Sequence, residues 1–242
     1  RYRLTKLYVD NGYINSGALF LGYDNHIKQL QFKLIEGKLE QINVTNTPHL
    51  PSNYIAKRVQ LAAGPPLHLP TLQERLILLL EDPLIQSLHT KLNPGVELGL
   101  ANLDIEATEK SRTNFSLSLD NYGAVSQGEH RGVLTGNLRN IIGLGEIVSL
   151  DYGLSTGNHN GRAHISLPVT PLISFQFGFE RSNALVIEEP ADILNIKSDY
   201  ISYTAGFNHI VLQNLRRRLT VGLGIEHRTH KTRLLDFPFS LG

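Results

Sequence analysis

From Arg112 onward, the sequence alternates between apolar and polar residues in one segment after another. In residues 217–229, RRLTVGLGIEHRT, every second residue from Leu219 to Ile225 is apolar, and the residues between them are polar or glycine. Successive side chains of a β-strand point to opposite faces of a sheet, so this period predicts a strand with one apolar and one polar face. The same pattern predicts six more strands, at residues 113–120, 130–138, 146–155, 161–169, 172–180 and 200–209.

Two architectures accommodate such strands. In a β-sandwich the apolar face packs against a second sheet, whereas in a transmembrane barrel it faces lipid and the polar face lines the lumen. The connections are, in order, YGAVSQGE, NIIGLG, TGNHN, VTP, a run of nearly twenty residues from Arg181 to Asp199, and VLQNLRR. Longer and shorter connections broadly alternate, although TGNHN is only marginally longer than its neighbour. This pattern favours a barrel with tight turns on one side.

The first 110 residues predict helices as well as strands. Residues 1–10 have helical spacing and stop at Asn11-Gly12, and strands follow at 14–21 and 28–37. A complete β-α-α-β-β unit comes next, with a strand at 39–46, helices over 54–62 and from Pro70, and strands at 85–93 and 100–109. The first unit matches the last three elements of the second. The sequence therefore predicts an internal repeat with a truncated first copy, and we expect the chain to be a fragment of a longer one.

Composition argues against several classes of function. The net charge is +1 with both signs dispersed, which predicts no nucleic-acid partner, and no apolar run approaches the roughly 18 residues of a membrane helix. The sequence has no cysteine, so it has neither disulfides nor a thiolate metal site. Its Gly-X-Gly pairs do not open a helix, its histidines lack converging ligands, and no nucleophile elbow occurs. We therefore expect no enzyme activity, no cofactor and no metal.

Several motifs resemble those of two-partner secretion transporters, the hemolysin secretion/activation (TpsB) family. They are DNYG at 120–123, the following GEHRGVLTGNLRNIIGLGEIVSLDYGLST, and the preceding LNPGVELGLANLDIEATE. GYINSGALF and LIEGKLEQI resemble the end of that family's first POTRA domain. The resemblance runs over nearly the whole chain in the right order. Two features depart from it: Glu146 stands where the family usually has Asp, and the long loop 181–199 has no counterpart that can be aligned.

The resemblance implies an α+β POTRA region followed by an antiparallel, all-β transmembrane barrel. Residues 1–38 would be the C-terminal part of a first POTRA domain, 39–110 a second POTRA domain, and 111–242 about seven of about sixteen barrel strands. Seven strands cannot close, so the fragment alone is not expected to be a working transporter. The implied location is the outer membrane, with contact to its lipid and with the POTRA domains in the periplasm. The implied function is secretion of a partner exoprotein, a TpsA-type protein whose N-terminal secretion domain is bound while unfolded.

The resemblance also implies that the POTRA region recognises the client. An extended client can bind an exposed sheet edge by strand addition, so we expect the edge strand 85–93 and the neighbouring helix 54–62 to bind it. The candidate residues are Tyr54, Arg58, Leu61, Gln86, Ser87, Leu88, His89, Thr90 and Leu92. A purely structural strand, covered by its neighbours, is the competing interpretation. Two other functions stay open: a barrel-assembly insertase of the same superfamily, and a soluble β-rich adhesin or binding module.

Overall fold

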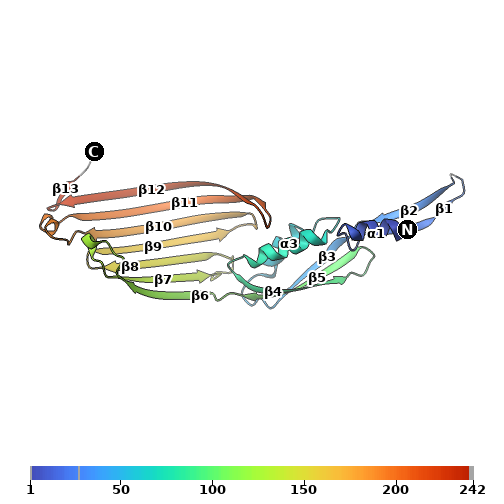
Figure 1. Ribbon diagram of the computed structural model, residues 1–242, viewed down its shortest axis with the longest axis horizontal. Coiled ribbons are helices and arrows are strands. Elements are labelled where there is room, and N and C mark those ends of the chain that lie inside the picture. The colour runs from blue at the N-terminus through green and yellow to red at the C-terminus, as the bar shows by residue number, and fades with distance from the viewer. Residues whose placement is uncertain (1, 27, 240–242) are drawn as a thin grey trace. The chain divides into compact units, whose positions relative to one another are not determined.

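The computed structural model describes residues 2–26 and 28–239 and separates the chain into two compact units. The N-terminal unit contains the residues up to Lys110 together with 213–218, and the C-terminal unit contains 111–212 and the residues from 219 onward. The boundary after Lys110 lies where mixed helices and strands give way to strands (Figure 1).

The N-terminal unit begins with a helix and a β-hairpin, as the sequence predicts. Helix α1, Tyr2–Asp10, is followed by the antiparallel strands β1, Gly17–Asp24, and β2, Gln29–Ile35. The helix ends at Asp10, and Gly12 just beyond it has a φ of +86°, which is accessible to glycine without strain. The helix lies against β1, where the N–H of Ala18 donates a hydrogen bond to Thr5 Oγ1 at 3.2 Å.

The rest of this unit has the predicted β-α-α-β-β order. Its elements are β3 Lys38–Thr45, α2 Ser52–Gln60, α3 Leu69–Leu80, β4 Ile85–Pro94 and β5 Leu100–Glu109. The sheet order is β3-β5-β4, with β3 parallel and β4 antiparallel to the central strand β5. The two helices cover one face of this sheet, because a small sheet needs such a layer to bury its apolar side. The buried side chains that form this core include Ile55, Val59, Leu67, Leu72, Leu79, Ile85, Leu103 and Ile105.

The C-terminal unit is an antiparallel sheet in which each strand pairs with its neighbours in sequence (Figure 1). Its order is β13-β12-β11-β10-β9-β8-β7-β6. The strands are β6 Thr113–Asp120, β7 Arg131–Arg139, β8 Ile147–Ser155, β9 Asn158–Pro168, β10 Ile173–Leu185, β11 Lys197–Gln213, β12 Arg218–Leu234 and β13 Phe237–Phe239. The seven predicted strands are confirmed. The short strand β13 was not predicted.

Strands β10 and β11 extend beyond the predicted segments. The backbone ladder between them continues to Leu185 and Lys197, past the point where apolar and polar residues alternate. Backbone pairing does not depend on the alternation, so the sequence pattern defines only the middle of these strands.

One predicted connection is wrong. TGNHN is a two-residue turn, Thr156–Gly157, because Asn158 already pairs with Ser155 at the start of β9. The expected alternation of longer and shorter connections therefore fails at this hairpin.

The two longest connections nevertheless share one end of the sheet. Because the strands run alternately up and down, the connections 121–130, 156–157, 186–196 and 235–236 lie at that end. Hydrogen bonds join the first three: Ile187 N–H donates to the Ser126 carbonyl at 2.8 Å, and Gly157 N–H to the Gln127 carbonyl at 2.7 Å.

In this sheet the apolar face is more exposed than the polar face, which is the reverse of the pattern in a β-sandwich. In β10, Phe175, Phe177 and Phe179 are 38%, 48% and 39% exposed, whereas Gln176 and Glu180 between them are half-buried. Among the described residues of this unit, no second sheet covers the apolar face. A sandwich buries its apolar face, so this pattern argues against a sandwich and fits a sheet that curves toward its polar face.

Candidate functional site

Strand β4 is an edge strand with backbone donors on its open side. It pairs only with β5 among the described residues, in an unbroken register from Ser87 opposite Thr108 to Pro94 opposite Ala101. Just beyond, the N–H of Gly95 donates to the carbonyl of Leu100 at 2.8 Å, which makes these two residues a hydrogen-bonded pair.

Hydrogen-bonded pairs recur at every second residue of an antiparallel ladder, so this bond fixes the direction of each N–H from Ser87 to Asn93. The N–H groups that point toward β5 are those of Ser87, His89, Lys91 and Asn93. The N–H groups of Leu88, Thr90 and Leu92 point to the open edge. The predicted strand thus offers three outward donors at alternate positions.

The side chains of the candidate residues in β4 differ in their surroundings. Leu88 and Leu92 pack partly against the core, whereas Thr90 and His89 are exposed. Gln86 is exposed beside the irregularity that separates Ile85 from Ser87 in the register. Thr90 is therefore the position where an outward N–H coincides with an exposed side chain.

The sequence predicts that helix 54–62, which is α2, lies beside this edge strand, and this prediction is wrong. Helix α2 packs on β3 and on α3, and it is α3 that lies beside β4. The order β3-β5-β4 explains this arrangement, because α2 follows β3 directly and α3 leads into β4 on the opposite side.

The two polar candidates on α2 are engaged with each other and with Asp82. The Tyr54 hydroxyl donates to Asp82 Oδ2 at 3.0 Å, and Arg58 Nε lies 3.2 Å from the same oxygen. The Arg58 guanidinium carbon stands 3.4 Å from the centre of the Tyr54 ring. Leu61, which follows the helix, is 44% exposed and takes no part in this cluster. Sequence reasoning did not identify Asp82, because it lies in the turn before β4, far from α2 along the chain.

The cluster predicts a measurable effect on stability. Burial and the neighbouring Asp82 carboxylate raise the pKa of the Tyr54 phenol, so Tyr54 remains a protonated donor at neutral pH. Tyr54→Phe removes one hydrogen bond and should lower the free energy of unfolding by about 1 kcal/mol. Asp82→Ala removes the carboxylate that Arg58 and Tyr54 share and frees the N–H of Leu84, so we expect a loss of about 2–3 kcal/mol.

The free energy of unfolding of the N-terminal unit is measured by denaturant titration of the whole protein. Lys57→Ala, at an exposed position of the same helix, is the control and should change stability by less than about 0.5 kcal/mol. Equal stability of Asp82→Ala and the unmodified protein would show that the cluster is not structural.

The polar face of the C-terminal sheet carries a row of charged residues at one level. Asp151 lies opposite Arg162, Arg162 opposite Glu180, and Glu180 opposite Ser202 on four successive strands. Arg162 Nη2 donates to Glu180 Oε1 at 2.9 Å, and Ser202 Oγ donates to Glu226 Oε1 at 2.7 Å. The row therefore continues to β12. The row holds one ion pair between strands, Arg162 with Glu180, and Glu226 forms a second with Arg228 on its own strand.

The turn between β7 and β8 contains Glu146, where the sequence departs from the pattern of the family that it resembles. Its carboxylate is buried and accepts hydrogen bonds from the N–H groups of Ile142 at 2.8 Å and Leu144 at 3.2 Å. Asn140 Oδ1 accepts a third bond, from the N–H of Gly145 at 2.9 Å. The carboxylate at this position therefore stabilises the turn by accepting backbone hydrogen bonds, and glutamate does so here.

In residues 2–26 and 28–239, no three His, Asp or Glu side chains are grouped so that they could hold a metal ion. No helix in this part of the chain is long and apolar enough to cross a membrane.

Comparisons with known proteins agree with this architecture. Escherichia coli CdiB superposes with a TM-score of 0.75 at 21% identity, over 97% of this chain and 45% of CdiB. Haemophilus ducreyi BamA lacking POTRA domains 1–3 superposes with a TM-score of 0.66 at 12% identity, over 97% of this chain and 44% of that chain. At these identities the superpositions show the fold alone.

Sequence comparison identifies the family. The hemolysin transporter protein HpmB of Proteus mirabilis is 29% identical over 179 residues, which are 72% of this chain and 30% of HpmB. The chain thus spans less than half the length of these relatives. The family model of the haemolysin secretion/activation proteins ShlB/FhaC/HecB matches residues 99–240, more than half of the sequence. The chain belongs to the haemolysin secretion/activation protein family.

Proposed function

We propose that this chain is part of an outer-membrane transporter that secretes and activates a partner exoprotein. The C-terminal sheet forms part of the barrel wall, with its apolar face toward lipid and its polar face toward the lumen. The observation that carries this proposal is the burial pattern of β10, where phenylalanines are more exposed than the polar residues between them. Family membership supports a role in secretion for this wall.

The polar row from Asp151 to Glu226 suits a conduit for an unfolded chain. Its side chains are polar, and Arg162 pairs with Glu180 across strands, so it gives a passing segment hydrogen-bonding partners and no apolar surface to adhere to. Passage along such a wall requires no chemical step by the protein, no cofactor and no nucleic acid.

The β-α-α-β-β part of the N-terminal unit acts as a POTRA domain in the periplasm, and α1-β1-β2 is the end of another. The open β4 edge of the β-α-α-β-β part binds the N-terminal secretion domain of the exoprotein while that domain is still extended. The outward N–H groups of Leu88, Thr90 and Leu92 support this proposal, because strand addition requires donors at alternate positions.

The wall described here has two open edges, β6 and β13, among the described residues. Unpaired strand edges are not tolerated in lipid. The working transporter therefore pairs these edges with further strands, and the experiments below use the complete transporter.

Cysteine labelling in intact cells tests the membrane topology. This chain has no cysteine, so single cysteines introduced into it give a clean signal once any cysteine elsewhere in the complete transporter is replaced by serine. A membrane-impermeant maleimide should label cysteines at Ser126 and Pro190, in the long connections, but not at Leu144 in a turn at the opposite end.

Leu144 is 56% exposed, so its protection in intact cells cannot come from burial within the chain. Lysed cells are the control, and there all three cysteines should react. Labelling of Leu144 alone in intact cells would reverse the orientation, and equal labelling of all three would exclude a membrane barrier between the two ends.

A further inference from the structure

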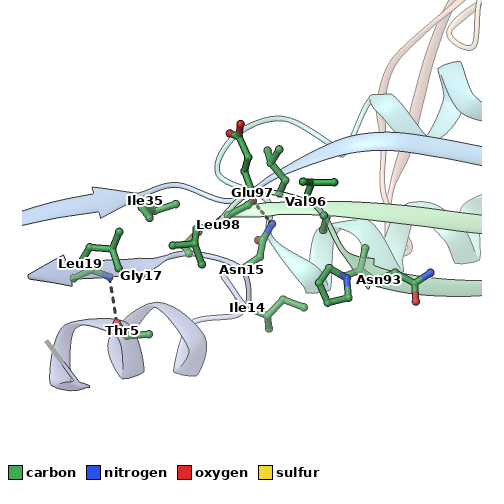
Figure 2. Close-up of a pocket in the computed structure, with 18 residues that line it drawn as sticks. Thr5, Ile14, Asn15, Gly17, Leu19, Ile35, Asn93, Val96, Glu97 and Leu98 are labelled. Carbon is green, nitrogen blue, oxygen red and sulfur yellow. Dashed lines mark hydrogen bonds between the residues drawn. The ribbon is translucent and has the colours of Figure 1, made fainter.

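A cavity in the N-terminal unit lies next to the open edge of β4. It has a volume of about 540 Å³ and is bounded by α1, β1, β2 and the turn between β4 and β5 (Figure 2). Pockets of about 300–1,000 Å³ are typical of ligand-binding sites. Its apolar lining consists mainly of Ile14, Leu19, Ile35, Leu92, Val96 and Leu98.

The walls of this cavity are fixed by polar contacts behind them. Asn15 Nδ2 donates to the carbonyl of Gly99 at 2.8 Å, and Ser16 Oγ accepts the N–H of Gly37 at 2.8 Å. Gly99 has a φ of +88°, and a Cβ there would lie 2.4 Å from Ile35 Cγ2. Glycine at this position allows the turn to approach β2 closely, so the cavity is preformed.

Two apolar side chains of the turn have no cover. Val96 is 93% exposed and Leu98 is 73% exposed, and both line the cavity. Neither belongs to the core cluster of the domain. Exposed apolar side chains beside a preformed cavity are typical of a binding surface rather than of a structural core.

The cavity and the open edge share Leu92. The N–H of Leu92 points to the open edge, and Leu92 lines the cavity together with Asn93 and Pro94 at the end of β4. A strand that adds to β4 through Leu88, Thr90 and Leu92 would therefore have one end beside the cavity. In strand addition, backbone bonds provide affinity and side-chain pockets provide specificity.

We propose that this cavity seats a large apolar side chain, such as Phe or Leu, at one end of the client segment that adds to β4. The occupant is an extended protein segment that presents this residue beside Leu92. The cavity selects among extended segments, which the backbone of β4 alone binds without regard to sequence. This inference rests on the proposed capture of the client at the β4 edge.

The test uses octapeptides of alternating Thr and Gln as probes, titrated calorimetrically into the complete transporter in detergent. Three variants of the peptide carry a single Phe at the first, a middle or the last position. We expect Phe at one terminal position to increase affinity on the order of tenfold or more, as burial of a large apolar side chain does. Phe in the middle should have no such effect.

Protein variants separate the cavity from the edge. Leu98→Ser should remove the preference for terminal Phe and leave the affinity for the parent peptide unchanged. Leu30→Ser, at an exposed position of β2 outside the cavity, is the matched control and should keep the preference. Thr90→Pro should abolish binding of every peptide.

The outcomes distinguish the two proposals. If the peptides bind and Thr90→Pro abolishes binding, but terminal Phe confers no gain or Leu98→Ser leaves the gain intact, the cavity proposal is wrong and capture at the edge stands. If no peptide binds the unmodified protein, capture at the β4 edge is wrong and the cavity proposal falls with it.

Discussion

Replacing Thr90 by proline is expected to abolish binding of the exoprotein's secretion domain while the N-terminal unit stays folded. Proline removes a backbone donor, and the N–H of Thr90 points to the open edge, where no strand in residues 2–26 and 28–239 uses it. The side chain is exposed, so its loss leaves no cavity. We expect a melting temperature within a few degrees of that of the unmodified protein, and the binding is measured by pull-down of the secretion domain.

His89→Pro is the matched variant, one residue away and also exposed. The N–H of His89 points toward β5, so proline there breaks the ladder and should destabilise the domain by about 1–3 kcal/mol. The pair distinguishes a lost client contact from a lost fold. A Thr90→Pro variant that is stable and binds its client normally would exclude strand addition at this edge. Recognition would then lie elsewhere in the N-terminal unit.

An arginine on the apolar face of the C-terminal sheet should destabilise the inserted barrel. Leu150 and Phe177 are on this face and are 40% and 48% exposed, which identifies them as lipid-facing positions under our proposal. Leu150→Arg or Phe177→Arg should cost about 2–4 kcal/mol if the residue lies near the bilayer midplane. Unfolding of the transporter from lipid vesicles by denaturant measures this cost.

Substitutions on the polar face provide the comparison. Asp151→Asn and Gln176→Glu change charge at positions adjacent in sequence to Leu150 and Phe177, and the lumen should tolerate both. Equal damage from the two sets would indicate a sheet that is packed on both faces, as in a soluble β-rich module.

The sequence predicts the architecture because two periodicities are strong in it. The period of two from Leu219 to Ile225 identifies β12, and the same pattern finds the six strands before it. The β-α-α-β-β order also follows, because Pro51, Pro70 and the Pro94-Gly95 turn separate its elements. These signals are local, and the structure confirms the elements that they predict.

Features that depend on contacts distant in sequence could not be predicted. The sequence of α2 does not show that Tyr54 and Arg58 contact Asp82, or that α3 rather than α2 lies beside β4. The sequence predicts a longer loop than the turn at Thr156–Gly157, because Asn158 and His159 resemble loop residues although they pair with β8. Which N–H groups of β4 face outward is a matter of register, which alternation alone does not fix.

The exposed apolar face and the family membership distinguish among the alternative functions. The exposed apolar face argues against a soluble module, since a surface of this kind in water would associate. The similarity to BamA shows the fold, which an insertase shares, whereas the family model is that of secretion and activation proteins. Secretion is therefore the function that we propose.

Photo-crosslinking during secretion tests the conduit most directly. A benzophenone amino acid is placed at Gln176 or at Phe177, adjacent residues of β10 that point to opposite faces of the sheet. While the exoprotein is being secreted, irradiation should crosslink it to position 176 and not to position 177. Crosslinks to the exoprotein at position 177, or at neither position while secretion continues, would contradict the proposal that the polar face of this sheet lines the path of the client.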